Sequence, residues 1–340
     1  MTMKKDKIFE EIKKALPRAR TGVPLKNFTT FKIGGPAKYF FRARNKNDLI
    51  KAIKAADKLK LPVFILGGGS NLLVSDKGFK GLVIKIQAAS YKIQGNKVYA
   101  EAGADLTELV YATANAGLSG LEWSAGIPGI TIGGAIYGHA QAFGAKMSDI
   151  VESAEAINLK TLEIKTFSKK QCQFSLKNSI FKKNKNLVII SALLEFKRKN
   201  PSQLKQQIKE NISYREARHP ICFPSAGSMF VNPEVIIKNR NLLMKFPELA
   251  EYNKKGVIPA GYLIVKCGLA GKKIGKAKIS EKHGNFIVNL GGANPVRKSS
   301  DFSNGVSAKD VLALVNLAKK KVKKTFNIDL ELEVQLMGFK

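Results

Sequence analysis

The chain has 340 residues, 44% of them hydrophobic, and it contains no apolar run of the about 18 residues that would cross a membrane. Its 58 lysines and arginines outnumber 26 aspartates and glutamates, giving a formal net charge of +32. Such a charge is typical of nucleic-acid-binding proteins. Here, however, the lysines are spread along the chain without an arginine-rich arm or basic tail, which favours solvated faces that steer small anions.

The length suggests about two or three domains. The charged amino terminus lacks the apolar core of a signal peptide, so we expect a cytoplasmic protein without a membrane segment. Cysteines 172, 222 and 267 are widely spaced and form no metal-ligand pattern, which predicts neither zinc nor structural disulfides.

The first part of the chain alternates helix and strand patterns. The predicted elements are a helix over residues 5–16, a strand over 37–43, a helix capped by Asn47-Asp48 and ending near Leu59, and a short buried strand over 62–66. A glycine turn follows this last strand. The order indicates an α/β unit whose turn lies at the carboxyl end of a strand, where ligands tend to bind.

The turn Gly67-Gly68-Gly69 is the first candidate ligand site. Three consecutive glycines remove every Cβ, so successive backbone N–H groups can approach an anion. Ser70 and Asn71 add side-chain donors. The pattern matches neither a P-loop nor a dinucleotide GxGxxG motif, and a plain tight turn is the alternative to a phosphate site.

A second glycine-rich stretch, residues 125–138, follows predicted strands over 82–86 and 97–102 and a predicted helix over 106–116. It is too apolar for a linker, and the sole tryptophan, Trp123, precedes it. The stretch is either a buried structural crossing or a wall around a planar ring. One phosphate-like loop and one apolar loop together suit a dinucleotide.

The rest of the chain divides at Asn200-Pro201. Before the break, strands are predicted over 150–158, 163–167 and 187–196, with a polar and basic segment over 174–181. After it come a helix over 202–218, a loop over 224–233, a lysine-rich insertion over 234–258, an exposed loop over 294–305, a helix over 311–326 and a strand over 328–337. Glu331 and Glu333 fall on one face of this last strand.

The loop Pro224-Ser-Ala-Gly-Ser-Met-Phe-Val-Asn-Pro233 is the candidate chemical element of the second half. Prolines bracket a run of small residues, so the loop offers little core and would present Ser228 and Asn232. An ordinary surface loop is the alternative.

Taken together, these segments resemble the family of the bacterial flavoenzyme UDP-N-acetylenolpyruvoylglucosamine reductase, over nearly the whole chain. The motifs that carry the resemblance are Asn27 to Gly35, Leu66-Gly-Gly-Gly-Ser-Asn-Leu-Leu73, Ala125-Gly-Ile-Pro-Gly129, Pro224-Ser-Ala-Gly-Ser228, Ala260-Gly-Tyr-Leu-Ile264, Ser280-Glu-Lys-His283 and Leu330-Glu-Leu-Glu-Val334. The resemblance implies an α+β fold: a vanillyl-alcohol-oxidase-type FAD domain in two lobes (1–75, joined by 329–340, and 76–199) and a substrate domain over 200–328.

The resemblance also implies roles for single residues. Ser228 would be the general acid, Glu333 its acidic partner (with Glu331 as the rival), and Lys177 the group that stabilises the developing anion. Arg218, Asn232 and Lys282 would contact the substrate. The residues implied to bind FAD are Gly67, Gly68, Gly69, Ser70, Asn71, Gly126, Ile127, Pro128, Gly129, Gly133 and Gly134.

In the implied reaction NADPH reduces FAD and leaves, reduced FAD gives hydride to the vinyl carbon of an enolpyruvyl ether, and Ser228 protonates the adjacent carbon. The expected partners are therefore NADPH and a UDP-sugar. We expect neither a metal nor a nucleic acid to bind, and we expect the enzyme to be a monomer. Alternatives are another FAD oxidase or dehydrogenase of the same superfamily, or a basic nucleic-acid-binding protein.

Three positions depart from the family pattern. Leu176-Lys177 replaces Tyr-Arg, which keeps the charge but loses the bidentate fork of arginine. His139-Ala-Gln-Ala142 replaces the flavin-side Asn-Ala-Gly-Ala, and Val265-Lys266 stands where a glutamate often follows. We expect an active reductase nonetheless.

Overall fold

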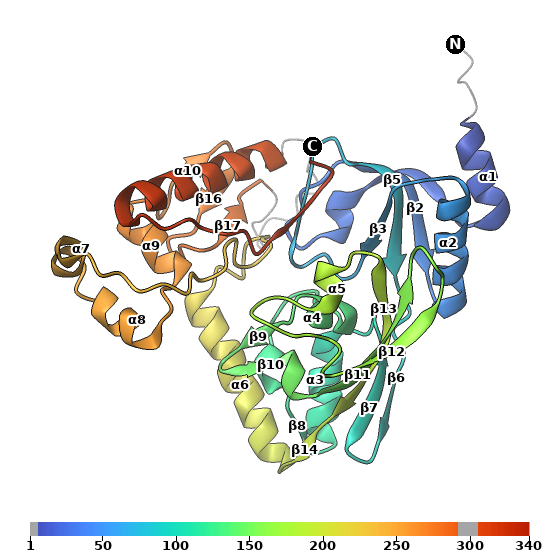
Figure 1. Cartoon of the computed structure of the whole chain (residues 1–340), viewed down its shortest axis with the longest axis horizontal. Coiled ribbons are helices and arrows are strands. Elements are labelled where there is room, and N and C mark those ends of the chain that lie inside the picture. The colour runs from blue at the N-terminus through green and yellow to red at the C-terminus, as the bar shows by residue number, and fades with distance from the viewer. Residues whose placement is uncertain (1–5, 292–304, 340) are drawn as a thin grey trace. The chain divides into compact units, whose positions relative to one another are not determined.

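The computed structural model describes residues 6–291 and 305–339. Their contacts group them into two compact units: unit 1 holds residues 6–24, 36–69 and 78–215, and unit 2 holds residues 25–35, 70–77, 216–291 and 305–339 (Figure 1). Both units mix helices and strands, so the predicted α+β class is confirmed. The three domain limits predicted from the sequence stay a prediction, and most of the predicted loop over 294–305 lies outside the described residues.

The first sheet of unit 1 has the order β1-β2-β5-β3, in which β2, β5 and β3 are parallel and β1 is antiparallel to β2. Helix α2 packs on β2 and β5, and α1 packs on α2 (Figure 1). The bounds are α1 Lys7–Ala15, β1 Arg20–Pro24, β2 Pro36–Ala43, α2 Lys46–Lys58, β3 Val63–Leu66 and β5 Phe79–Ile86.

The predicted cap of α2 is wrong by two residues. Asn45, not Asn47-Asp48, has the extended backbone of an N-cap, and its side-chain oxygen accepts a 2.8 Å hydrogen bond from the Asp48 amide. Asn45, Asn47 and Asp48 all carry cap-forming side chains within four positions, so composition alone does not select among them.

The second sheet of unit 1 is antiparallel, in the order β12-β11-β13-β7-β6. Buried residues of β11 and β13 belong to one hydrophobic core with buried residues of the first sheet, which is why both lobes form one unit. The bounds are β6 Tyr91–Gln94, β7 Lys97–Glu101, α3 Leu106–Asn115, β8 Leu118–Ser119, η2 Glu122–Ser124, α4 Ile132–Tyr137, β9 Gln141–Ala142, β10 Ala145–Lys146, η3 Met147–Asp149, β11 Val151–Asn158, β12 Ile164–Ser168, α5 Ile180–Lys183, β13 Leu187–Glu195 and β14 Lys197–Arg198.

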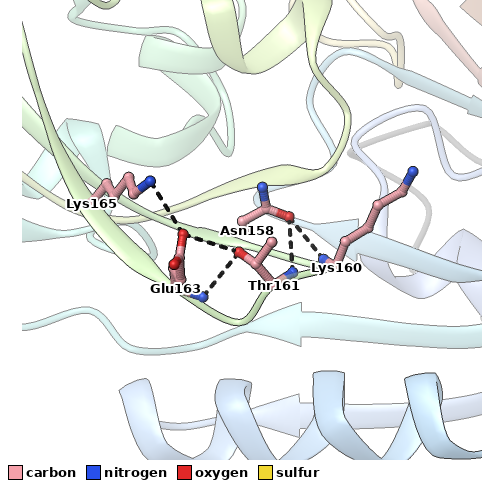
Figure 2. Close-up of polar contacts among 5 residues, drawn as sticks. All are labelled: Asn158, Lys160, Thr161, Glu163 and Lys165. Carbon is pink, nitrogen blue, oxygen red and sulfur yellow. Dashed lines mark hydrogen bonds and ion pairs between the residues drawn. The ribbon is translucent and has the colours of Figure 1, made fainter.

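Polar side chains close the β11–β12 hairpin (Figure 2). The Asn158 side-chain oxygen accepts hydrogen bonds from the amides of Lys160 and Thr161 at 2.8 and 3.4 Å, as in an Asx-turn. Beyond the turn, Glu163 forms a 3.2 Å ion pair with Lys165, and its amide donates to the Thr161 hydroxyl. These local bonds fix the register of the two strands.

Helix α6, Pro201–Arg218, continues from unit 1 into unit 2, the division falling after Arg215. In unit 2, α10 packs on α9 and on β15 and β16 of a three-stranded antiparallel sheet, over a separate core (Figure 1). The bounds are η1 Leu25–Phe28, β4 Leu72–Val74, α7 Arg240–Lys245, α8 Leu249–Lys255, α9 Ala260–Lys266, β15 Lys273–Ile274, β16 Ala277–Ile279, β17 Ile287–Asn289, α10 Ala308–Phe326 and β18 Gln335–Met337.

The strand predicted over 328–337 is much shorter than expected. Leu332 forms an antiparallel bridge with Phe230, and only β18 is a continuous strand, pairing in parallel with β4. The segment changes partner between these two contacts. Alternation of apolar residues predicted the extended backbone correctly but carries no information about the change of partner.

Within the described part of the chain, no helix combines the length and apolarity needed to cross a bilayer. The same residues contain no group of three His, Cys, Asp or Glu side chains arranged for a metal ion. Cys172, Cys222 and Cys267 are free thiols.

Candidate active site

The glycine turn after β3 is held by a buried lysine. Lys85, on the neighbouring strand β5, donates a 2.6 Å hydrogen bond from Nζ to the Gly67 carbonyl oxygen. Burial, with a smaller contribution from Arg42, lowers the pKa of Lys85. The bond fixes the first peptide of the turn and places a cationic group beside it.

The two glycine-rich stretches predicted separately are in contact in unit 1. A Cβ on Gly68 would lie 1.6 Å from the Gly129 carbonyl oxygen, so only glycine fits at this position. A Cβ on Gly67 would lie 3.1 Å from the Thr131 hydroxyl. The structure therefore brings Gly67 and Gly68 against the stretch that contains Gly126, Ile127, Pro128 and Gly129.

The second stretch is partly helical, which the sequence did not indicate. The Thr131 hydroxyl accepts a 3.3 Å hydrogen bond from the Gly134 amide and caps α4. Gly133 is buried beside Ala102, the residue that follows β7, and a Cβ on Gly133 would lie 2.8 Å from that of Ala102, whereas Gly134 is exposed. Close packing against Ala102 therefore accounts for the glycine at position 133, whereas Gly129 and Gly134 are exposed.

These features fit the diphosphate and ring of a flavin dinucleotide. Side chains are absent where the turn approaches the second stretch, and a lysine accompanies the backbone that would face a diphosphate. Trp123, by contrast, is buried and donates to the Gly120 carbonyl at 3.0 Å, as a structural residue would.

Ser70 and Asn71 belong to unit 2, where Asn71 meets the carboxyl-terminal segment. Its side-chain amide donates to the Glu333 carbonyl at 3.1 Å, and its own carbonyl accepts from the Gln335 amide at 3.1 Å. The Thr30 hydroxyl lies 3.4 Å from the Ser70 carbonyl and 2.8 Å from that of Ser225. Within unit 2, Thr30 thereby links Ser70 to the serine loop.

The serine loop lies between two backbone partners in unit 2. Ser228 forms an antiparallel bridge with Phe286 on one edge, and Phe230 forms one with Leu332 on the other. Glu333 is half-buried, whereas the rival Glu331 is exposed. Ser228 and Glu333 thus lie on adjacent hydrogen-bonded segments although 105 positions separate them (333 − 228).

Lys177 occupies an unusual backbone conformation in unit 1. It lies in a tight turn closed by reciprocal 3.1 Å hydrogen bonds between Ser175 and Asn178, and its φ is +51°. A non-glycine residue in this region costs about 1 kcal/mol or more, so surrounding contacts must hold it. Lys182 donates from Nζ to the Lys177 carbonyl at 2.8 Å.

His139, one of the departures from the family pattern, supports the same turn. It is buried, its Nδ1 donates to the Ser175 carbonyl at 2.6 Å, and its Nε2 accepts from the Ser148 hydroxyl at 3.0 Å. Burial lowers the pKa of His139, and the ring stacks on Phe174 with centroids 4.7 Å apart.

The three residues predicted to bind substrate have different surroundings in unit 2. Arg218 is exposed at the end of α6, and Lys282 donates from Nζ to the Glu216 carbonyl at 2.6 Å, at the same helix end. Asn232 accepts a 2.9 Å hydrogen bond from the Ala260 amide and so caps α9. The structure groups Arg218 and Lys282 at one helix end, and their binding roles stay predictions.

The sequence did not indicate the supporting roles of Lys85, Thr30 and Asn285. Lys85 interrupts an otherwise apolar strand, Leu82 to Ile86, and this interruption was the available signal. Thr30 and Asn285 carry no such signal, because the loop groups that their side chains bind are 40 to 195 positions away in the sequence.

The fold and these loops define a flavin-binding reductase with a separate carboxyl-terminal domain. Residues 37–166 match the FAD binding domain family, and residues 219–297 match the family described as the UDP-N-acetylenolpyruvoylglucosamine reductase C-terminal domain. The chain belongs to the UDP-N-acetylenolpyruvoylglucosamine reductase family.

Full-length relatives support this membership. The UDP-N-acetylenolpyruvoylglucosamine reductase of Bacillus subtilis is 35% identical over 98% of this chain and 99% of its own length. That of Alkaliphilus oremlandii is 34% identical over 99% of both chains. The crystal structure of the Thermus caldophilus enzyme matches with a TM-score of 0.70 and 29% identity, over 94% of this chain and 98% of that one.

Proposed function

We propose that this protein is the NADPH-dependent flavoenzyme that reduces UDP-N-acetylglucosamine enolpyruvate to UDP-N-acetylmuramate for peptidoglycan synthesis. The proposal is carried by the pairing of the Ser228 loop with the Glu333 segment in a chain that matches the reductases over their full length. The pairing supports the proposal because Ser228 and Glu333, the proposed acid and its acidic partner, lie on neighbouring backbone segments.

FAD, when bound, would supply the hydride chemistry, accepting hydride from NADPH and giving it to the vinyl carbon of the substrate's C=C bond. The backbone of Gly67, Gly68 and Gly69, with Lys85 beside it, would hold the diphosphate. Gly129 and Gly134 would offer backbone without side chains to the ring. Two glycine stretches in contact support this division of roles.

Ser228 would donate the proton that completes the reduction. Hydride addition to the vinyl carbon leaves negative charge on the adjacent carbon and its carboxylate, and the Ser228 hydroxyl would protonate that carbon. Lys177 would stabilise the charge electrostatically, and the left-handed backbone that presents it is the kind of strain found at functional sites. Glu333 would polarise or reprotonate the serine.

Arg218 and Lys282 would attract the diphosphate of the UDP-sugar, aided by the net charge of +32. Asn232, which caps α9, would reach the nucleotide only if that cap also leaves its amide nitrogen available. Free thiols at all three cysteines favour a reducing compartment. We propose that the reaction takes place in the cytoplasm and that the enzyme is a monomer.

The two half-reactions can be tested separately, without oxygen. In Ser228→Ala, we expect NADPH to bleach the flavin absorbance near ~450 nm at a rate within about twofold of the wild type. The rate at which the enolpyruvyl substrate reoxidises the flavin, seen as return of the absorbance (recolouring), should fall about 10²–10⁴-fold, because the proton donor is gone. Unchanged recolouring would show that Ser228 is not the acid. Wild-type flavin that NADPH bleaches but the substrate cannot recolour would exclude the reductase function.

A further inference from the structure

Asn285 is buried, 4% exposed, and its side chain binds the backbone of the serine loop at two points. The Phe230 amide donates to Oδ1 at 2.9 Å, and Nδ2 donates to the Phe230 carbonyl at 2.8 Å. The main-chain carbonyl of Asn285 also accepts from the Met229 amide at 2.8 Å. One residue therefore satisfies three backbone groups next to Ser228.

The opposite edge of the loop shows why this side chain is needed. The carboxyl-terminal segment bonds to Met229 and Val231, through the Glu333 amide at 2.9 Å and the Glu331 carbonyl at 3.0 Å. In an antiparallel pair, the N–H and C=O of the residue between two such bonds point away from the partner strand. Phe230 is that residue, so its N–H and C=O point away from the carboxyl-terminal segment. There they bind the side-chain amide of Asn285, which makes the two hydrogen bonds that a neighbouring strand would otherwise make.

We propose that Asn285 is a positioning residue that sets the location of the Ser228 hydroxyl for proton transfer. The inference rests on the proposed function, because it takes Ser228 to be the acid. Phe230 is fully packed, 1% exposed, so the backbone cannot turn its N–H and C=O to water when the Asn285 side chain is lost. The loop would instead shift, and a displacement of about 1 Å at a reacting group costs about 10²-fold in rate.

The chain contains a matched control. Asn253, also in unit 2, makes the same pair of bonds to a single residue: the Ile237 amide donates to Oδ1 at 2.9 Å and Nδ2 donates to the Ile237 carbonyl at 2.8 Å. Its loss removes equivalent bonds from a segment to which no chemical role is assigned. A purely structural asparagine would behave as Asn253 does.

The test compares Asn285→Ala, Asn285→Asp, Asn253→Ala and Ser228→Ala as FAD-loaded enzymes. In both Asn285 variants we expect flavin bleaching by NADPH within about twofold of the wild type and substrate-driven recolouring slowed about 10- to 100-fold. The solvent deuterium isotope effect on recolouring should increase, because proton transfer becomes rate-limiting. Asn253→Ala should lower the melting temperature and leave both half-reactions unchanged.

Hydrogen exchange provides a readout that does not depend on turnover. The Phe230 amide should exchange faster in Asn285→Ala than in the wild type, and in Asn285→Asp, which keeps the acceptor and the side-chain volume, it should stay protected. Asn285→Asp also serves if the alanine variant does not fold. Protection retained in the alanine variant would overturn the proposal.

The kinetic outcomes distinguish this inference from the function on which it rests. If recolouring is unchanged in Ser228→Ala, then Ser228 is not the acid, and the positioning role proposed for Asn285 is overturned as well. Recolouring that collapses in Ser228→Ala but keeps its rate and isotope effect in both Asn285 variants overturns the positioning role alone. Equal slowing of both half-reactions in the Asn285 variants would show general destabilisation and would also overturn it.

Discussion

The backbone amide of Glu333 donates a 2.9 Å hydrogen bond to the carbonyl of Met229, the residue that follows Ser228. Both partners of this bond are backbone groups, so it holds the Glu333 backbone beside the serine loop regardless of the side chain at position 333. Substitutions at position 333 can therefore remove the carboxylate and leave this backbone bond in place.

Glu333→Gln should slow substrate-driven recolouring about 10- to 100-fold and leave NADPH-driven bleaching unchanged, because the amide cannot relay a proton to Ser228. Glu331→Gln is the matched control, one pleat away and exposed, and should behave as the wild type. Stopped-flow absorbance of the two half-reactions measures both. The reverse pattern, with Glu331 sensitive and Glu333 silent, would assign the role to the rival residue.

Lys85→Met should weaken FAD binding about tenfold to a hundredfold, since it removes a hydrogen bond from a cationic group to the Gly67 carbonyl. Titration of the apoprotein with FAD, followed by flavin fluorescence, gives the dissociation constant. Lys80, exposed on the same strand, provides the control Lys80→Met, whose affinity should not change. An unaltered affinity in Lys85→Met would mean that the turn holds its shape alone.

Lys177→Met should slow recolouring about 10²-fold, because it removes the charge proposed to stabilise the anion. Lys177→Arg should restore or exceed the wild-type rate, since arginine adds the planar fork that the family pattern contains. Lys183→Met, a lysine exposed in α5, controls for the lost surface charge. A Lys177→Met enzyme as fast as the control would show that the charge is supplied elsewhere.

The stability of the protein should fall as the pH drops below about 6.5, the ordinary pKa of histidine. Burial lowers the pKa values of His139 and His283. Below the ordinary pKa, these two histidines therefore bind protons in the unfolded chain but stay neutral in the folded chain. The contribution of each histidine to the free energy of unfolding is thus fully present above its pKa in the unfolded state. It is lost as the pH falls towards its pKa in the folded state. The slope is at most about 1.4 kcal/mol per pH unit for each group.

His139→Asn tests this assignment with the residue that the family pattern has at that position. Urea unfolding at pH 7.5 and at pH 5.5 should show a smaller pH dependence in the variant than in the wild type. The groups that face His139 and also affect its pKa are Lys146, Asp149 and Lys177. An identical pH dependence in both proteins would place the titration on other residues.

The sequence predicted the architecture well because most elements carry local signals. The apolar stripes of α1 and α10 and the glycine turn after β3 lie where their patterns placed them. The helix within the second glycine stretch was missed because Gly133 and Gly134 disfavour helix intrinsically, and the buried contact with Ala102 overrides that preference.

The candidate site was predicted less completely, for a physical reason. Gly68, Ser228 and Glu333 lie in distinctive local motifs, whereas the groups that hold them come from distant parts of the chain. Asn285 reaches Phe230 across 55 positions and Lys85 reaches Gly67 across 18, so neither partner is apparent from a sequence window.

The division of unit 2 into three separate stretches of chain determines how the protein can be assembled. The Thr30 hydroxyl donates to the Ser225 carbonyl across 195 positions, and among the described residues β18 has no strand partner other than the distant β4. A fragment beginning at residue 216 would lack Phe31, Ile33 and Leu73 from its core and leave β18 as an open, aggregation-prone edge. The carboxyl-terminal part is therefore not expected to fold as an isolated domain. Because many of its contacts join residues far apart in the sequence, we expect unit 2 to fold slowly and late.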